Sequence, residues 1–117
     1  MTDFNETQPI FVQIRERIAT MILSETAREG EALPSVRSIA ADLSVNPLTV
    51  TRAYDALVDL GVVESRRGMG MFVAGGARDK LLAHERQKFL TDEWPRLRAR
   101  IKSLGLDIDA LLKDTGK

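Results

Sequence analysis

The amino-acid sequence predicts a mainly helical protein with one small β-hairpin, an α+β fold class. Apolar residues recur at the helical spacing of three and four in the first half of the 117-residue chain and again near its end. Between these regions, two short β-prone runs at 62–65 and 71–73 flank a connection that contains glycine, which is typical of a hairpin. This order of elements predicts a compact domain followed by a helical tail.

The first predicted helix covers residues 9–24. Pro9 suits its first position, because the N–H that proline lacks would have no partner there. One face of this helix is apolar, and its residues are Phe11, Ile14, Ile18, Met21 and Ile22. The polar stretch 28–31, which contains Gly30, predicts a turn, and residues 1–8 are expected to form a loose arm.

Two further helices are predicted on either side of a tight turn. Ser35 can cap the first of them, and Asn46 can cap the second with Pro47 in its first position. The buried stripe of the first comprises Val36, Ile39, Ala40 and Leu43. The apolar face of the second comprises Val50, Ala53, Tyr54 and Leu57, of which we interpret Tyr54 as a core residue. Gly61 ends this helix.

The hairpin and a hinge complete the predicted domain. Residues 66–70, Arg-Arg-Gly-Met-Gly, form the connection between the two β-prone runs. Gly75 and Gly76 then predict a hinge. We place the domain boundary there, with one domain over 1–76 and a helical tail over 77–117.

The tail is expected to mediate dimerisation. Its helical pattern carries an a/d-type apolar stripe, made of Leu90, Trp94, Leu97, Ile101 and Leu104. Pro95 should break or kink the helix near Trp94, because proline disrupts the backbone hydrogen bonding of a helix interior. Gly105 should end the helix, and Asp107 should cap a last short one.

The composition excludes several functional classes. The chain has no cysteine and a single histidine, His84, which excludes disulfides and metal sites built from thiolates or several histidines. No apolar run approaches the roughly 20 residues that span a bilayer, and the polar N-terminus is unlike a secretory signal. No nucleophile–base pair is apparent. We therefore expect a cytoplasmic protein that is not an enzyme and holds no metal or cofactor.

The charge distribution requires a local explanation for any binding of nucleic acid. The net charge is zero. Residues 1–76 carry 7 Lys or Arg and 10 Asp or Glu, a net charge of −3, and residues 77–117 carry the balancing +3. A prediction of DNA binding must therefore rest on a local cluster of residues rather than on bulk charge.

The order of the elements nevertheless suits DNA, because it is that of a winged helix-turn-helix. The second helix of such a turn presents its first residues to base edges in the major groove. Its N-terminal N–H groups and helix dipole also favour a nearby phosphate. Gly68 and Gly70 let the hairpin tip approach the duplex closely, and Arg66 and Arg67 can reach phosphates or the minor groove.

At this point the residues resemble the GntR family of bacterial regulators. The resemblance covers residues 9–113 and rests on Pro-Ile-Phe-Val-Gln-Ile at 9–14, Leu-Pro-Ser-Val-Arg-Ser-Ile-Ala at 33–40, Thr-Val-Thr-Arg-Ala-Tyr-Asp-Ala-Leu at 49–57, Gly61, and Arg-Gly-Met-Gly-Met-Phe-Val at 67–73. The Asn-Pro-x-Thr-Val run at 46–50 and the short tail are most similar to the YtrA subfamily. That resemblance implies a helical dimerisation region in place of a large ligand-binding domain.

The resemblance also implies roles for individual residues. Arg37 matches an arginine that contacts DNA in related regulators, and its guanidinium can meet guanine O6 and N7 or a phosphate. Asn46, Leu48, Thr49 and Thr51 match the contact region of the recognition helix, and the tip of the hairpin matches the wing. The predicted DNA-binding set is Arg37, Asn46, Leu48, Thr49, Thr51, Arg52, Arg66, Arg67, Gly68 and Gly70.

The chain departs from its relatives at positions that matter for recognition. Pro47 stands where many relatives carry a basic residue, and Thr51 stands where others carry arginine. Ser44 replaces the usual turn glycine, at a cost of roughly 1 kcal/mol if its backbone is left-handed. Glu25 and Glu29 replace a common Gly and Pro. The operator preference of other branches therefore does not transfer to this chain.

Several of these residues have plainer interpretations. Arg37 can instead pair with a carboxylate such as Asp42, and Arg52 can pair with Asp55 on the helix surface. The two arginines of the hairpin tip can belong to an ordinary solvated turn. Thr49 can bond locally at the start of its helix. Trp94 is interpreted as a packing or dimer anchor, and His84 as a solvated helix residue.

Taken together, these features predict a dimeric repressor. The tail is too short to cover its own stripe, so we expect the same stripe of a second chain to cover it in a two-fold homodimer. Two recognition helices would then read two half-sites of a palindromic operator in double-stranded DNA. The short tail leaves room for a small-molecule effector at the dimer interface, and the sequence identifies none.

Two rival functions remain open at this stage. The near-neutral domain is compatible with a winged-helix protein–protein interaction module that does not bind DNA. An RNA-binding module is a second alternative, although the sequence lacks paired exposed aromatic residues for base stacking. The salt dependence of binding to duplex DNA separates the first rival from the regulator, and competition by single-stranded RNA tests the second.

Overall fold

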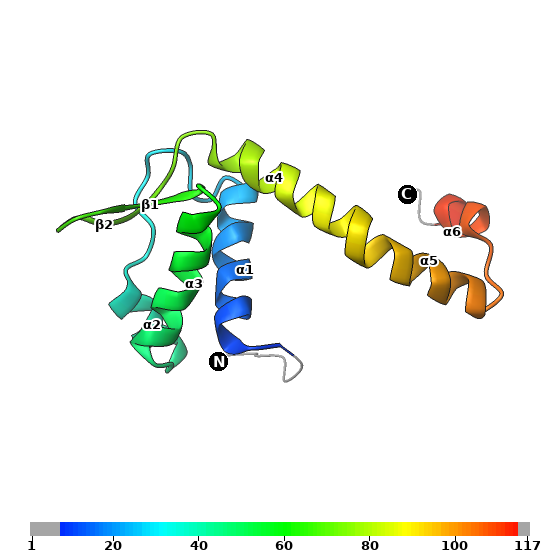
Figure 1. Ribbon diagram of the computed structural model, residues 1–117, viewed down its shortest axis with the longest axis horizontal. Helices are drawn as coiled ribbons and strands as arrows, with labels where there is room; N and C mark the ends of the chain where they lie inside the picture. Colours follow the sequence, from blue (N-terminus) through cyan, green and yellow to red (C-terminus); the bar gives the residue numbers. More distant parts are fainter. Residues whose placement is uncertain (1–7, 115–117) are drawn as a thin grey trace. The chain divides into compact units, whose positions relative to one another are not determined.

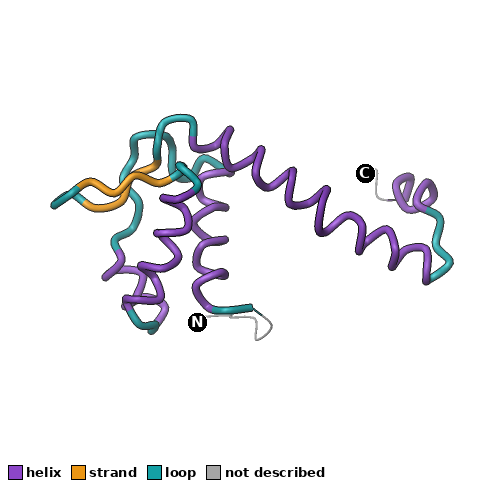
Figure 2. The backbone as a smooth tube through the Cα atoms, in the orientation of Figure 1, coloured by secondary structure: helices purple, strands orange, loops and turns teal. Residues whose placement is uncertain are grey.

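A computed structural model describes residues 8–114 of the chain (Figures 1 and 2). Its elements are α1 (Ile10–Leu23), α2 (Val36–Leu43), α3 (Pro47–Asp59), β1 (Val63–Arg66), β2 (Gly70–Val73), α4 (Ala77–Lys88), the π-helical turn η1 (Phe89–Glu93), α5 (Trp94–Ser103) and α6 (Ile108–Asp114). The described chain is thus mainly helical with one antiparallel two-stranded hairpin, which confirms the predicted fold class. Nearly all of the predicted arm at residues 1–8 lies outside the described residues.

The core of the first compact unit forms where α1 and α2 pack against α3. Its fully buried side chains include Ile14, Ile18 and Ile22 of α1 and Val50 and Leu57 of α3, all less than 2% exposed. Tyr54, which is 0% exposed, fills the centre of this core, as its place on the apolar face of α3 predicted. Figure 1 shows α2 beside the first turns of α3 and the hairpin projecting on the side where α2 lies.

Local side-chain caps determine where α2 and α3 begin. The hydroxyl oxygen of Ser35 accepts a hydrogen bond of 2.9 Å from the backbone N–H of Ser38. The side-chain oxygen of Asn46 accepts one of 2.8 Å from the N–H of Leu48, and Pro47 is the first residue of α3. Both caps satisfy N–H groups that a helix start otherwise leaves unpaired, and both confirm the prediction.

The turn between these helices requires a left-handed residue. Ser44 has φ 54° and ψ 47°, a conformation that glycine adopts at little cost and that other residues avoid. This geometry lets the N–H of Val45 bond to the carbonyl of Ala40 at 3.0 Å. The chain therefore makes the tight turn of the helix-turn-helix without the usual glycine.

The hairpin gains a third segment that the sequence did not reveal. In the hairpin itself, Val63 pairs with Val73 and Arg66 with Gly70. Ala32 forms an additional bridge to Phe72, with backbone hydrogen bonds of 2.8–2.9 Å on either side. The stretch that was predicted only as a turn thus leads into a short pairing along β2, which anchors the hairpin to the helical core.

The start of α4 also belongs to the first compact unit, which ends at Leu82. Ala77 and Leu81 are 0% and 1% exposed. The carboxylate of Glu29 accepts a hydrogen bond of 2.5 Å from the N–H of Gly76, so the predicted hinge is held by the loop that follows α1. The predicted division into a DNA-binding domain over 1–76 and a dimerisation tail stays a prediction.

The second compact unit begins at Ala83 and shows how Pro95 disturbs its helix. Helix α4 runs into η1, and α5 follows directly with Pro95 in its first turn. The N–H of Trp94 bonds to the carbonyl of Phe89, five residues earlier. Because proline offers no N–H, the regular ladder cannot continue through it, and a wider π-helical turn takes its place. The predicted disturbance near Trp94 is therefore present, and it takes the form of a π-helical turn rather than a break in the helix.

The last part of the described chain has the helix end and the helix cap that the sequence predicts. Gly105 has φ 70° and ends α5, and the N–H of Leu106 bonds to the carbonyl of Ile101 at 3.1 Å. The carboxylate of Asp107 then accepts a hydrogen bond of 3.2 Å from the N–H of Asp109 at the start of α6. Among the described residues, every helix is too short or too polar to cross a membrane.

Candidate nucleic-acid interface

Three of the regions that the sequence singled out meet at one hollow on the first compact unit. The hollow has a volume of about 510 Å³. It is lined by Ser35, Val36, Arg37, Pro47, Gly70 and Met71. These residues come from the start of α2, the start of α3 and the first residues of β2. The fold therefore brings together parts of the chain that lie more than 30 residues apart in sequence.

Arg37 is exposed at the start of α2 and free to meet a ligand. It is the second residue of the helix and lines the hollow. Within residues 8–114, its side chain makes no hydrogen bond or ion pair, so the alternative pairing with Asp42 is absent from the structure. A guanidinium that no carboxylate neutralises is available for a phosphate or a guanine edge.

The start of α3 presents fewer polar groups than expected. The N–H groups of Leu48 and Thr49 bond to the side chain and backbone of Asn46, at 2.8 and 2.9 Å. The hydroxyl of half-buried Thr51 donates to the carbonyl of Pro47 at 3.1 Å. The N–H groups of Leu48 and Thr49 are therefore not free for a phosphate, because Asn46 already accepts from both. The expected attraction of a phosphate by the helix dipole stays a prediction. Leu48, which is 71% exposed, is the prominent side chain of this turn.

Arg52 lies on α3 against an aromatic ring of α1. Its guanidinium carbon is 4.2 Å from the centroid of the Phe11 ring, a cation–π geometry. No ion pair joins it to Asp55 among the described residues, so that alternative is also absent. The side chain remains exposed, and a role for Arg52 in DNA contact stays a prediction.

The two arginines of the wing differ in their surroundings. The guanidinium of Arg66 is 2.8 Å from the carboxylate of Glu64 and 4.1 Å from the centroid of the Phe72 ring. Arg67 is exposed, and within the described part of the chain it makes no such contact. Gly68 and Gly70 have φ of 75° and 109°, with open space where a side chain would lie. The tip therefore offers one unpaired cation, Arg67, beside two glycines that flank the exposed Met69.

The apolar stripe of the tail is largely uncovered. Leu90, Leu97 and Leu104 are 62%, 47% and 57% exposed, and Trp94 and Ile101 are half-buried. The Trp94 ring lies 6.4 Å from the Phe89 ring, centroid to centroid. Sequence periodicity missed two exposed apolar residues of this unit, which are Phe89 and Leu106. Position 89 falls off the stripe in a regular helix, so spacing alone gave no signal for it.

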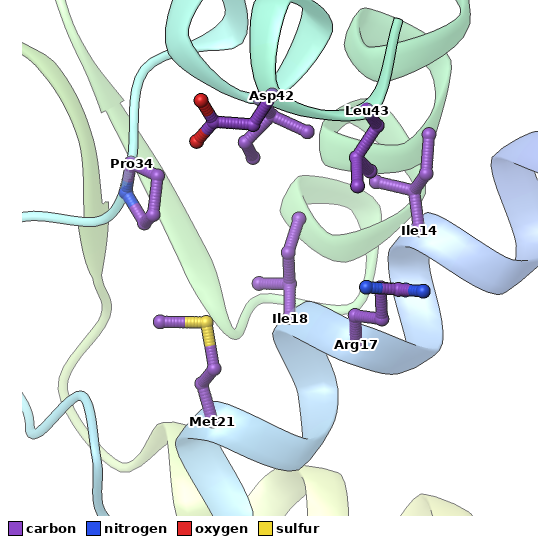
Figure 3. A pocket seen from close by; sticks show the side chains of 8 residues that line it. Ile14, Arg17, Ile18, Met21, Pro34, Asp42 and Leu43 are labelled. Atoms are coloured by element: carbon purple, nitrogen blue, oxygen red, sulfur yellow. The ribbon is translucent and has the colours of Figure 1, made fainter. Parts of the chain in front are cut away.

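A second hollow, of about 260 Å³, lies between α1 and α2 (Figure 3). Ile14, Ile18 and Met21 of α1 form one wall, and the only charged residues of its lining are Arg17 and Asp42. It contains no residue of the predicted DNA-binding set. Its position shows that α1 and α2 each pack on α3 and leave a mainly apolar groove between them. Within the described chain, no cluster of His, Asp and Glu could hold a metal ion.

Comparison with known proteins identifies the family. The profile of the family described as "Bacterial regulatory proteins, gntR family" matches residues 11–73, which include α1, the helix-turn-helix and the wing. The chain belongs to the GntR family. This family consists of transcriptional regulators with a DNA-binding helix-turn-helix, not of enzymes.

Two curated GntR relatives from Bacillus subtilis place the chain more narrowly. It is 34% identical over 116 residues to the uncharacterized HTH-type transcriptional regulator YhcF, which covers 94% of this chain and 89% of the relative. It is 34% identical over 80 residues to the HTH-type transcriptional repressor YtrA, with 68% and 62% covered. The chain is therefore a YtrA-like member of the GntR family.

Solved structures of GntR proteins share the fold. A GntR family transcriptional regulator from Listeria monocytogenes superposes with a TM-score of 0.76 at 26% identity, covering 94% of this chain and 95% of that one. The DNA-binding domain of AraR in complex with the operator ORR3 superposes with a TM-score of 0.57 at 26% identity, covering 63% and 87%. The latter protein holds operator DNA on the same type of domain.

Proposed function

We propose that this GntR regulator is a homodimeric repressor that binds a palindromic operator through the hollow between α2, α3 and the wing. The observation that carries the proposal is the meeting of Arg37, Pro47 and Gly70 around this single hollow. The recognition helix, the helix before it and the wing are the three parts through which a winged helix approaches a duplex. The operator complex of the AraR domain supports the same use of this surface here.

The individual contacts follow from the chemistry of each position. The unpaired guanidinium of Arg37 is suited to a guanine edge or a phosphate. The first turn of α3, including Asn46, Leu48, Thr49 and Thr51, would enter the major groove. Arg67 with Gly68 and Gly70 would lie over a phosphate or the minor groove. Because residues 1–76 carry a net charge of −3, these few cations must supply the electrostatic attraction locally.

The dimer is proposed on the uncovered stripe of the tail. Three of its leucines are about half exposed or more, and burial of apolar surface stabilises association. A two-fold dimer would cover each stripe with its own copy. It would also set two recognition helices against two half-sites. Repression would follow from occupation of a promoter in the cytoplasm, where the chain and its operator meet.

The test is fluorescence anisotropy of a labelled duplex that carries the promoter of the chain's own gene. Arg37→Ala and Arg67→Ala should each weaken binding about fivefold or more, because a charged contact to DNA contributes about 1–3 kcal/mol. Arg28→Ala is the matched control, since Arg28 is also exposed and lies outside the hollow. Equal losses in all three variants would contradict the proposed surface.

The rival without DNA binding is a winged-helix protein-interaction module, which the acidic balance of residues 1–76 favours. If the folded dimer binds neither the promoter duplex nor a random-sequence pool at low salt, the regulator proposal fails. A single-stranded RNA that competes as well as duplex DNA would also contradict the proposal. Duplex binding that RNA does not displace supports the regulator.

A further inference from the structure

We propose that Leu48 reads the 5-methyl group of a thymine in each half-site of the operator. This inference rests on the proposed function and deepens it by naming the base feature that the recognition helix selects. Thymine is the only standard base of DNA with a methyl group in the major groove. An apolar side chain at the start of a recognition helix therefore has one natural partner among the base edges.

The exposure of Leu48 is the first observation behind the proposal. It is the second residue of α3 and is 71% exposed, the highest value among the large apolar side chains of residues 8–114. The rest of the apolar face of α3 is buried, with Val50, Tyr54 and Leu57 all at 0%. Leu48 therefore contributes nothing to the core that packs α3. The apolar surface of an exposed leucine is removed from water only when a binding partner covers it.

The occupation of the neighbouring polar groups is the second observation. The side-chain oxygen of Asn46 is held by the N–H of Leu48, and the hydroxyl of Thr51 is held by the carbonyl of Pro47. Pro47 itself has no N–H and an apolar ring. The first turn of α3 therefore presents Leu48 as its main outward group. Polar base reading is left to the amide nitrogen of Asn46 and to Thr49.

The rigidity of this turn is the third observation. The cap of Asn46 and the proline at the first position hold the backbone of Leu48 in place. Pro47 also borders the hollow that Arg37 and Gly70 line. Leu48 follows Pro47 directly in sequence. If a duplex occupies the proposed interface, Leu48 therefore lies on the helix that enters the major groove. A side chain on a fixed backbone can discriminate between a base with and without one methyl group.

The expected effect is small and measurable. Burial of one methyl group contributes enough to change affinity about fourfold. In a dimer with two equivalent half-sites, removal of both methyl groups should therefore weaken binding about 16-fold when the two effects add. The same loss should depend on the presence of the leucine side chain.

The experiment uses the full chain and a duplex that the wild-type protein selects from a random-sequence pool. Each thymine is replaced in turn by deoxyuridine, which lacks only the methyl group, and binding is measured by anisotropy. One symmetric pair of positions should show the loss with the wild-type chain. The Leu48→Ala variant should bind the thymine and deoxyuridine duplexes with an affinity ratio of about one. The thermal unfolding of this variant should stay unchanged because the residue is exposed. Met69→Ala is the matched control, since Met69 is 68% exposed on the wing tip.

The outcomes separate this inference from the proposed function. If no duplex is selected, the proposed function fails. If a duplex is selected but deoxyuridine is tolerated everywhere, or if Leu48→Ala keeps the full loss at the sensitive thymine, the reading by Leu48 is overturned and DNA binding stands. If Met69→Ala rather than Leu48→Ala removes the discrimination, the methyl group is read by the wing and the inference is also overturned.

Discussion

The hydroxyl of Tyr54 donates a hydrogen bond to the carbonyl oxygen of Pro34. Tyr54 is buried in the middle of α3, and Pro34 directly precedes Ser35, the N-cap of α2. The contact thus joins the proposed recognition helix to the start of the helix that carries Arg37. It links two of the three parts that surround the candidate interface.

Replacement of Tyr54 by phenylalanine should weaken this link without emptying the core. We expect Tyr54→Phe to lower the free energy of unfolding by about 1–2 kcal/mol, because the carbonyl of Pro34 loses its partner. Urea unfolding followed by circular dichroism measures this loss. Operator affinity should fall as well, since the start of α2 is less firmly placed. An unfolding free energy equal to that of the wild-type chain would contradict the structural role of the bond.

The same residue predicts a response to high pH. Burial raises the pKa of Tyr54 above its ordinary value of about 10. The unfolded state therefore releases this proton first as the pH rises. The stability that the neutral ring contributes is complete below about pH 10 and is lost above it. The chain has a single tyrosine, so tyrosinate absorbance reports Tyr54 alone. Its ionisation should coincide with alkaline unfolding, and ionisation near pH 10 in a folded chain would contradict the burial.

The left-handed backbone of Ser44 predicts a stabilising substitution. Ser44→Gly should raise the free energy of unfolding by about 0.5–1 kcal/mol, because glycine adopts this conformation without steric cost. The control is Ser24→Gly, since Ser24 also follows a helix but has φ −83°. Thermal unfolding of both variants measures the difference. A gain at Ser24 equal to that at Ser44 would show that backbone handedness is not the cause.

The exposed stripe of the tail predicts the oligomeric state. Leu97→Glu should convert a dimer into a monomer, because it places a charge on an apolar interface. Ala99→Glu introduces the same charge two residues away, off the stripe, and should leave the dimer intact. Sedimentation velocity over a range of protein concentrations distinguishes these outcomes. The dimer proposal does not survive a wild-type chain that sediments as a monomer throughout, or equal effects of the two substitutions.

The elements of the fold could be predicted where their signals are local. Ser35, Asn46 and Pro47 start helices through contacts within three residues, so sequence alone placed them correctly. Gly105 and Asp107 acted in the same way at the end of the tail. The stretch at Ala32 could not be predicted, because its pairing partner Phe72 is distant in sequence and no alternation marks so short a segment.

The candidate interface was predictable in its location but not in its side-chain contacts. The positions of Arg37 and the wing tip followed from motif spacing. The contacts that occupy Arg52 and Arg66 involve Phe11 and Phe72, whose proximity depends on the packing of whole elements. The π-helical turn before Pro95 was missed for a related reason, since a proline indicates that a helix is disturbed without indicating how.

The salt dependence of operator affinity tests the central claim most directly. Binding of the wild-type chain should weaken steeply between about 50 and 200 mM salt, because phosphate binding releases condensed counterions. A variant that combines Arg37→Ala and Arg67→Ala should bind more weakly and with a shallower slope, by about one unit for each phosphate that the variant no longer neutralises. Wild-type binding that is independent of salt, or a double variant with both affinity and slope unchanged, would contradict a DNA-binding surface at α2, α3 and the wing.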